Sequence, residues 1–199
     1  ERELRAKKWD GWRPTHMIGA KVTGKTLGII GFGRIGQAMA SRGHFGFGMK
    51  IKIFSRSQVS AELLERYNAE QFNSVETLLR KSDFVSLHCP GGTSNRHLIN
   101  ASNLAQARPE LVLINTARGE VIDEVALANA LENKTIKAAG LDVFDGEPNI
   151  NPNLMTAPNL VMLPHLGSAT RETREEMGFR ALANCRAFFE GETPMDKVA

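Results

Sequence analysis

The chain has 199 residues, which is long enough for one sizeable hydrophobic core and short for two. Its 42% hydrophobic and 24% charged residues are ordinary for a globular domain and exclude a disordered chain. The 25 basic residues barely outnumber the 22 acids, and no apolar run is long enough to cross a bilayer, so we expect neither nucleic acid nor a membrane as partner.

The two cysteines, Cys89 and Cys185, lie in dissimilar surroundings and form no CxxC pair. This usage favours neither a disulfide framework nor a zinc site, so we predict no metal site. The charged start, ERELRAKKWD, lacks the apolar segment of a signal peptide. We therefore expect a reducing, cytoplasmic compartment.

From Thr26 onwards, short apolar runs alternate with segments of helical periodicity. The runs are continuous rather than alternating, which is typical of parallel strands covered on both faces. We predict strands at Thr26–Ile30, Ile51–Phe54, Phe84–His88, Leu111–Asn115, Ala138–Phe144 and Asn159–Leu163. We predict helices at Arg34–Phe45, Ala61–Tyr67, Ser74–Arg80, Asp123–Leu131 and Thr170–Glu190.

Several residues mark the ends of these elements. Asp123 is a plausible N-cap, Ser74 with Thr77 could begin a helix, and Gly191 is a natural stop for the last one. The segment 145–158 carries three prolines and is predicted as loop, and 192–199 as a tail. Repeated strand–helix–strand units predict an α/β fold with a doubly wound parallel sheet in three α/β/α layers, the Rossmann fold, as one domain over 1–199 with its core at about 20–190.

A glycine pattern follows the first predicted strand. Gly31, Gly33 and Gly36 form GxGxxG between a strand and a helix, the context that indicates dinucleotide binding. The first glycine allows a tight turn, the second lets a pyrophosphate approach the backbone, and the third lets helix and strand pack closely. The amides near Arg34 and Ile35, with the helix dipole, favour the anion. The alternative is a tight turn that needs glycine for backbone reasons only.

The second strand ends in the sequence IFSRS. An NAD site normally carries Asp or Glu here, which binds the ribose hydroxyls and repels a 2′-phosphate. This chain has Ser55, Arg56 and Ser57 instead, whose guanidinium and hydroxyls can donate to a phosphate. We therefore predict NADP(H) as the preferred cofactor, with NAD(H) also accepted. The alternative is a solvated Arg56 in a permissive NAD site.

Three further phrases lie at or just after the carboxyl ends of predicted strands, the edge where ligands bind in open parallel sheets: NTARGEVIDE, GLDVFDGEP and LPHLGSAT. With GWRPTHMIGAKVTGKTLGIIGFGRIG and LHCP they occur in an order that resembles the D-2-hydroxyacid dehydrogenase family over nearly the whole chain. GWRPTHMIG, FSRS and DGEPNINP resemble most the glyoxylate and hydroxypyruvate reductases of that family.

The resemblance implies a role for each matching position. Arg118 would pair its guanidinium with the carboxylate of a 2-oxo acid and orient its carbonyl. His165 would donate a proton to the carbonyl oxygen, and Glu147 would hydrogen-bond the imidazole. The alternatives are a surface arginine, a histidine that caps the following helix, and an exposed loop acid.

Other matching positions would surround the cofactor. Asp142 would face the nicotinamide carboxamide, or alternatively cap the strand end; His88 would form the pocket wall and Cys89 would be a small packing residue. The predicted cofactor set is Gly31, Gly33, Arg34, Ile35, Gly36, Ser55, Arg56, Ser57, His88, Cys89, Pro90, Thr116, Ala117, Asp142, His165 and Gly167.

The chain departs from the family after LHCP. Many relatives have a Leu-Thr pair there, whose hydroxyl helps to line the cofactor site, whereas this chain has Gly91 and Gly92. Thr93 or Asn95 are the candidates to replace that contact.

In the family, the cofactor domain is inserted into a substrate-binding domain, and neither segment of that domain is recognisable here. We therefore expect the cofactor-binding domain of an NADP(H)-preferring reductase of small 2-oxo acids such as glyoxylate or hydroxypyruvate, homodimeric, and weakly active or inactive alone. Phosphoglycerate, formate or lactate specificity is a second interpretation. The alternative from another class is a non-enzymatic, dinucleotide-sensing regulator of the corepressor type.

Overall fold

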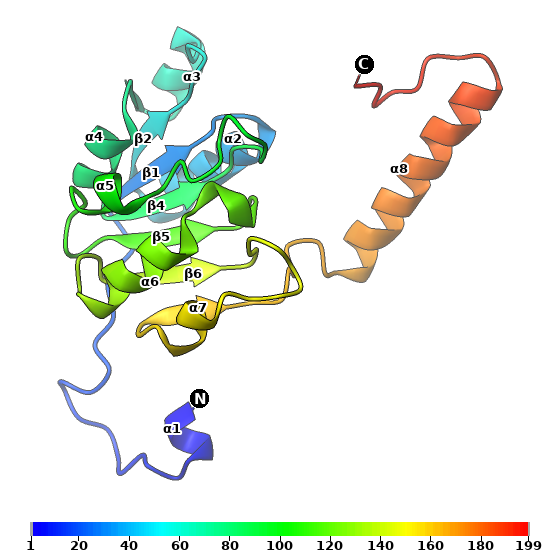
Figure 1. Ribbon diagram of the computed structural model, residues 1–199. Helices are drawn as coiled ribbons and strands as arrows, with labels where there is room; N and C mark the ends of the chain where they lie inside the picture. Colours follow the sequence, from blue (N-terminus) through cyan, green and yellow to red (C-terminus); the bar gives the residue numbers. More distant parts are fainter. Residues whose placement is uncertain (1, 199) are drawn as a thin grey trace.

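The computed structural model describes residues 2–198 and contains a seven-stranded sheet in which all neighbouring strands are parallel (Figure 1). The strands lie in the order β3-β2-β1-β4-β5-β6-β7. They are β1 (Thr26–Ile30), β2 (Lys50–Phe54), β3 (Glu70–Phe72), β4 (Phe84–Leu87), β5 (Val112–Asn115), β6 (Ala138–Leu141) and β7 (Leu160–Met162). The order reverses at β1 and β4, so the loops after these two strands diverge and leave a crevice for a ligand. The doubly wound fold predicted from the sequence is confirmed.

Helices cover both faces of this sheet, and they are α2 (Arg34–Ser41), α3 (Ala61–Arg66), α4 (Val75–Arg80), α5 (Ala101–Leu104), α6 (Glu124–Glu132) and α7 (Pro152–Thr156). Two further helices, α1 (Arg2–Arg5) and α8 (Arg171–Phe189), lie away from the sheet. Successive residues of a strand point to opposite faces, and the core accordingly has two clusters. Leu27 and Ile29 of β1 pack with Ala40 of α2 in one cluster, while Ile30 packs in the other with residues of α4, α5 and α6.

The predicted caps are present. The Ser74 hydroxyl accepts from Thr77 N at 3.2 Å at the start of α4, and Asp123 Oδ1 accepts from Ala126 N at 3.0 Å at the start of α6. Gly191, with φ of +77°, follows the end of α8. A side chain at this φ would be strained, which explains why the helix stops at a glycine.

Several predicted boundaries were wrong. The predicted strand Ala138–Phe144, which is β6 in the structure, ends at Leu141 rather than Phe144, because the chain turns where Asp142 becomes an anchor for another loop. The predicted loop 145–158 contains the short helix α7, whose start is capped by Asn151. The predicted helix Arg34–Phe45, by contrast, is helical throughout, as α2 (Arg34–Ser41) continued by a π-helical turn, Arg42–Gly46. The three-residue strand β3 and the short helices α1 and α5 were not predicted, because such short elements carry too few residues to show a period.

The two ends of the chain extend away from the sheet (Figure 1). Every residue of α8 is at least partly exposed, including its large apolar side chains such as Phe179 and Phe189. The tail after α8 folds back on it, because the Asp196 carboxylate accepts from Arg180 and Asn184. Within residues 2–198, no helix combines the length and apolar character that crossing a bilayer requires.

Candidate functional site

The glycine turn between β1 and α2 is held by backbone contacts. Gly31 has φ of +90°, and a Cβ there would lie 2.7 Å from Cys89 N and 2.8 Å from the His88 carbonyl group. A Cβ on Gly36 would collide with the Gly31 carbonyl oxygen. At Gly33, by contrast, no other atom of the described residues lies within 4 Å of the place where a Cβ would be. Two glycines therefore close the turn, and the third keeps open space beside it.

The start of α2 completes this cradle. Its N-cap is Gly33, and no side chain in residues 2–198 caps it. The first amides of the helix, around Arg34 and Ile35, are therefore available to an anion, and the helix dipole favours negative charge there. The turn thus fits a pyrophosphate.

The loop after β2 is held in place by β3. Gln71 Nε2 donates to the carbonyl oxygens of Ser55 and Ser57 at 3.2 and 3.0 Å, and its Oε1 accepts from Val59 N at 2.9 Å. Arg56 reaches across to the loop after β4, where its Nη1 donates to the Ser94 hydroxyl at 3.1 Å. Sequence reasoning missed Gln71 and Ser94, because nothing in their own surroundings in the sequence marks them.

The loop after β4 contains a partly buried histidine and a buried cysteine. Burial lowers the pKa of His88, whose Nε2 lies 2.9 Å from the Ser86 hydroxyl. Burial raises the pKa of the Cys89 thiol and keeps it uncharged and poorly reactive. Both features are compatible with a pocket wall and a packing residue.

The Glu120 side chain lies against the glycine pair, Gly91 and Gly92, that follows LHCP. Gly92 N donates to Glu120 Oε1 at 2.6 Å, and a Cβ on Gly91 would collide with the same oxygen. Asn95 is buried and donates to the Pro90 carbonyl oxygen at 2.8 Å, so its side chain closes its own loop. Asn95 is therefore committed to the loop, and Ser94 is the residue of this segment that meets Arg56.

The turn after β5 presents Arg118 on the surface. The buried Asn115 shapes this turn, since its Oδ1 accepts from Ala117 N at 3.0 Å and its Nδ2 donates to Arg118 O at 2.9 Å. A Cβ on Gly119 would overlap the peptide that joins Phe144 and Asp145. The NTARG turn therefore lies directly on the chain after β6. Thr116 is exposed and Ala117 partly exposed beside the arginine.

The centre of the site is a hydrogen bond between His165 and Glu147. His165 Nδ1 donates to Glu147 Oε2 at 2.8 Å, and Glu147 Oε1 accepts from Phe144 N at 2.8 Å. The hydrogen bond from His165 holds the pKa of Glu147 below its usual range, and the Phe144 amide and the Arg118 charge act in the same direction. Because the carboxylate engages Nδ1, the imidazole Nε2 is the ring atom that can exchange a proton with a substrate.

Asp142 anchors the loop that carries His165. The residue is 5% exposed, and its carboxylate accepts from Leu166 N at 2.7 Å and from Gly167 N at 2.8 Å. His165 itself has φ of +53°, a left-handed conformation that is strained for a residue other than glycine. Asp142 thus joins the end of β6 to the loop after β7, and a contact with the nicotinamide stays a prediction.

The glycine turn, the Arg118 turn and the His165–Glu147 pair all follow carboxyl ends of parallel strands and define a dinucleotide-binding domain. Residues 1–167 match the model described as "D-isomer specific 2-hydroxyacid dehydrogenase, NAD binding domain". The chain therefore belongs to the D-isomer-specific 2-hydroxyacid dehydrogenase family, as its resemblance predicted.

Known relatives agree with this assignment. The glyoxylate reductase of Thermococcus litoralis is 47% identical over 188 residues, which are 94% of this chain and 56% of that protein. The NADPH-dependent glyoxylate/hydroxypyruvate reductase of Sinorhizobium meliloti superposes with a TM-score of 0.87 at 33% identity, over 100% of this chain and 61% of that one. The D-lactate dehydrogenase of Lactobacillus jensenii, solved with NAD+, gives 0.83 at 28% identity, over 99% and 62%.

The chain thus spans 56% to 62% of the length of these relatives. They are reductases and dehydrogenases and give no support to the corepressor-like alternative. Their names include both NADPH and NAD+, so they indicate an NAD(P)-binding domain without deciding which cofactor it prefers.

Proposed function

We propose that this chain is the cofactor-binding domain of a reductase that converts small 2-oxo acids, such as glyoxylate or hydroxypyruvate, into 2-hydroxy acids. The observation that carries the proposal is the 2.8 Å hydrogen bond between His165 and Glu147 on the same sheet edge as the glycine turn. The names of the relatives support the substrate class. NADP(H) is the proposed preferred cofactor, with NAD(H) as the less favoured one.

The residues of this edge fit two parts of the dinucleotide, its central pyrophosphate and its nicotinamide end. We propose that Gly31, Gly33, Gly36 and the amides of Arg34 and Ile35 hold the pyrophosphate. The nicotinamide end would be surrounded by His88, Cys89, Pro90, Thr116, Ala117, Asp142, His165 and Gly167. When bound, the reduced nicotinamide supplies the hydride.

The chemistry of the remaining residues follows from their charges. Arg118 pairs its guanidinium with the substrate carboxylate and so orients the carbonyl carbon. His165 gives the proton on Nε2 to the carbonyl oxygen, and the same atom takes it back in the oxidation direction. Glu147 fixes the ring through Nδ1 and stabilises the protonated imidazole. The three side chains thus orient the substrate, move the proton and hold the proton donor.

The role of His165 is tested by His165→Gln in the full-length protein. We expect kcat for NADPH oxidation with glyoxylate and hydroxypyruvate to fall about a hundredfold, the size typical of losing a general acid. The dissociation constant of NADPH should change less than about twofold, because hydride transfer and not cofactor binding needs the proton. An unchanged kcat would remove His165 from the proposal.

The NADP(H) preference rests on Arg56. Its side chain bonds Ser94 with one of its donors, so other N–H groups of the guanidinium can bind a 2′-phosphate. Arg56→Ala should weaken NADPH binding about tenfold to a hundredfold, as expected for one charge-assisted contact, and leave NADH binding nearly unchanged. Isothermal titration of the chain with both cofactors measures this. Equal losses for NADPH and NADH would contradict the preference.

Three expectations about the whole protein remain part of the proposal. First, the part of the relatives that this chain does not span would form the substrate-binding domain. Second, the protein would form a homodimer. Third, it would act in the cytoplasm. Exposed apolar side chains at both ends, such as Trp12 and Phe189, support an additional contact surface, and the two free cysteines support a reducing compartment. Sedimentation that shows only monomer at micromolar concentration would contradict the dimer.

A further inference from the structure

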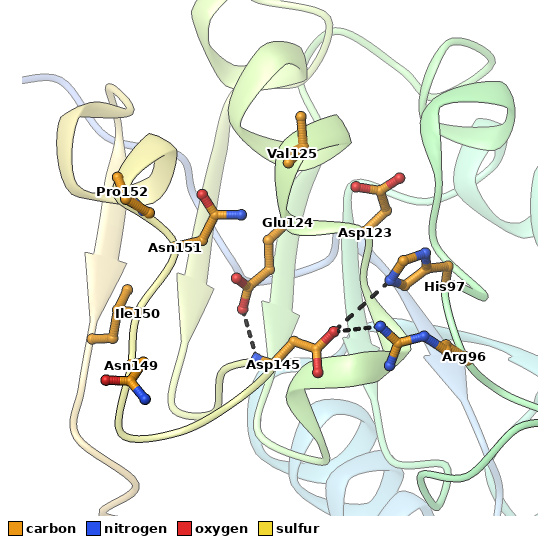
Figure 2. A pocket seen from close by; sticks show the side chains of 10 residues that line it. All are labelled: Arg96, His97, Asp123, Glu124, Val125, Asp145, Asn149, Ile150, Asn151 and Pro152. Atoms are coloured by element: carbon orange, nitrogen blue, oxygen red, sulfur yellow. Dashed lines mark hydrogen bonds and ion pairs between the residues drawn. The ribbon is translucent and has the colours of Figure 1, made fainter.

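A second glutamate, Glu124, is buried and hydrogen-bonds to the loop that carries Glu147. Glu124 lies in the first turn of α6, is 6% exposed, and its Oε1 accepts from Asp145 N at 2.8 Å. Figure 2 shows the Glu124 carboxylate pointing at the backbone of Asp145. Both residues line a cavity of about 470 Å³. Glu147, which belongs to the proposed catalytic site, lies two residues after Asp145 in the same loop.

A buried carboxyl at this place is costly to keep. Desolvation raises the pKa of Glu124, and the neighbouring charge of Asp145 raises it further, while the Asp145 amide and His97 act against them. An apolar residue of similar size would avoid this cost. The hydrogen bond from Asp145 N to the Glu124 carboxyl offsets part of this cost. It also fixes the position of the Asp145 amide, two residues before Glu147.

The same peptide is fixed on its other sides. Gly119 packs against it so closely that a Cβ there would overlap it, and the adjacent Phe144 N donates to Glu147 Oε1. Arg96 holds the Asp145 side chain, with Nη2 donating to Oδ2 at 2.9 Å (Figure 2). Glu124 is a buried side chain, whereas the Arg96–Asp145 ion pair is partly exposed, so the hydrogen bond of Glu124 competes less with water.

We propose that Glu124 is a positioning residue for the His165–Glu147 pair, acting through the Asp145 amide. It touches neither substrate nor cofactor. Its hydrogen bond sets where the Asp145 peptide lies, and that peptide sets where the Glu147 carboxylate meets His165. The proposal rests on the proposed function for its catalytic meaning, but its test is spectroscopic and does not need turnover.

Two variants separate hydrogen-bond reach from charge. Glu124→Gln keeps an oxygen acceptor at the same length without the charge, whereas Glu124→Asp keeps the charge on a side chain that is one methylene too short to reach Asp145 N. Both are small changes, and Glu124→Leu is the more disruptive third variant. Each is made in the 199-residue chain labelled with 13C and 15N.

Two signals are followed by NMR. The first is the titration of the Glu147 carboxyl carbon, whose pKa lies below its usual range while His165 donates to it. The second is hydrogen exchange of the Asp145 amide. In Glu124→Asp and Glu124→Leu we expect the Glu147 pKa to move back toward its usual value and the Asp145 amide to exchange at least about tenfold faster, a change of about 1.4 kcal/mol in local opening. Glu124→Gln should leave both signals close to those of the original chain.

Two outcomes would overturn the proposal. One is a Glu147 titration that is unchanged in folded Glu124→Asp, which would leave Glu124 with a purely structural role. The other is a Glu124→Gln variant that behaves like Glu124→Asp, which would assign the effect to charge. The test of the proposed function, His165→Gln, uses turnover instead, so either hypothesis can fail while the other stands.

Discussion

The two sides of the ligand-binding edge are built in different ways. On the side of β1 and β2, which we call the glycine side (Gly31, Gly33 and Gly36), backbone packs directly on backbone at Gly31 and Gly36. On the side of β5 to β7, which we call the carboxylate side (Glu124, Asp142 and Glu147), acidic side chains accept from backbone amides. Glu124 and Asp142 bind amides of loops from other parts of the chain, and Glu147 binds the Phe144 amide of its own loop. The first construction fixes shape by steric exclusion, and the second fixes it by hydrogen bonds.

This difference has a physical consequence. A backbone contact without side chains cannot relax by a rotamer change, so any added atom forces the helix and strand apart. A carboxylate anchor can be shortened, neutralised or protonated, so its loop can be loosened in steps. We therefore expect substitutions at the packed glycines, Gly31 and Gly36, to act in an all-or-none way and those on the carboxylate side to be graded.

The largest effect is expected for Gly36→Ala. The added methyl would collide with the Gly31 carbonyl oxygen and lie 3.3 Å from Ile29 Cγ2, so α2 must move away from β1. We expect a loss of about 3 kcal/mol in the free energy of unfolding, measured by urea denaturation, and cofactor binding too weak to detect by calorimetry. Gly33→Ala is the matched control: it has open space, so it should weaken cofactor binding without lowering stability. Equal free energies of unfolding for Gly36→Ala and Gly33→Ala would contradict the difference between a packed and an unpacked glycine.

A smaller effect is expected for Asp142→Ala on the carboxylate side. The Leu166 and Gly167 amides would lose their acceptor, and hydrogen bonds to a charged group of this kind contribute about 2 kcal/mol together once water can reach the freed amides. Hydrogen exchange should show the change at residues 165–167 and not in α2. Asp142→Asn keeps one acceptor oxygen and should lose about half as much. If the two variants were equal, the graded behaviour proposed for this side would be wrong.

The glycine pattern could be predicted from the sequence because its three glycines lie within six residues, although the packing of Gly31 against His88 and Cys89 could not. The anchors of the carboxylate side could not. Asp142 binds amides 24 and 25 residues away, and Glu124 binds one 21 residues away, so no local pattern announces either contact. The residues implied by the family resemblance, Arg118, Glu147 and His165, fall together in space, but Gln71 and Ser94 were found only when the loops were placed. β3 was missed because three residues cannot show a period.

The pH dependence of stability separates two acids within the carboxylate side. The pKa of Glu147 is lowered by folding, so its contribution is complete above the unfolded value of about 4.3 and is lost as pH falls through the folded value. The pKa of Glu124 is raised, so stability instead falls as pH rises from about 4.3 through its folded value. Thermal melts between pH 3 and 7 measure both effects. In Glu147→Gln the fall in melting temperature at low pH should be smaller than in the original chain. In Glu124→Gln the fall in melting temperature at higher pH should be absent. Identical profiles for the two variants would contradict the opposite signs.

The smallest effect is expected where a carboxylate anchor is exposed rather than buried. Asp196 accepts from Arg180 Nε and Nη2 at 2.6 and 2.9 Å and from Asn184 Nδ2 at 2.6 Å, and these contacts hold the pKa of the carboxyl well below its usual range. The chemistry is like that of Asp142, but water surrounds the groups and can replace each contact. Asp196→Ala should leave the melting temperature of the domain unchanged and remove hydrogen-exchange protection only in residues 192–198. A fall in melting temperature as large as that of Asp142→Ala would show that burial does not decide what such an anchor contributes.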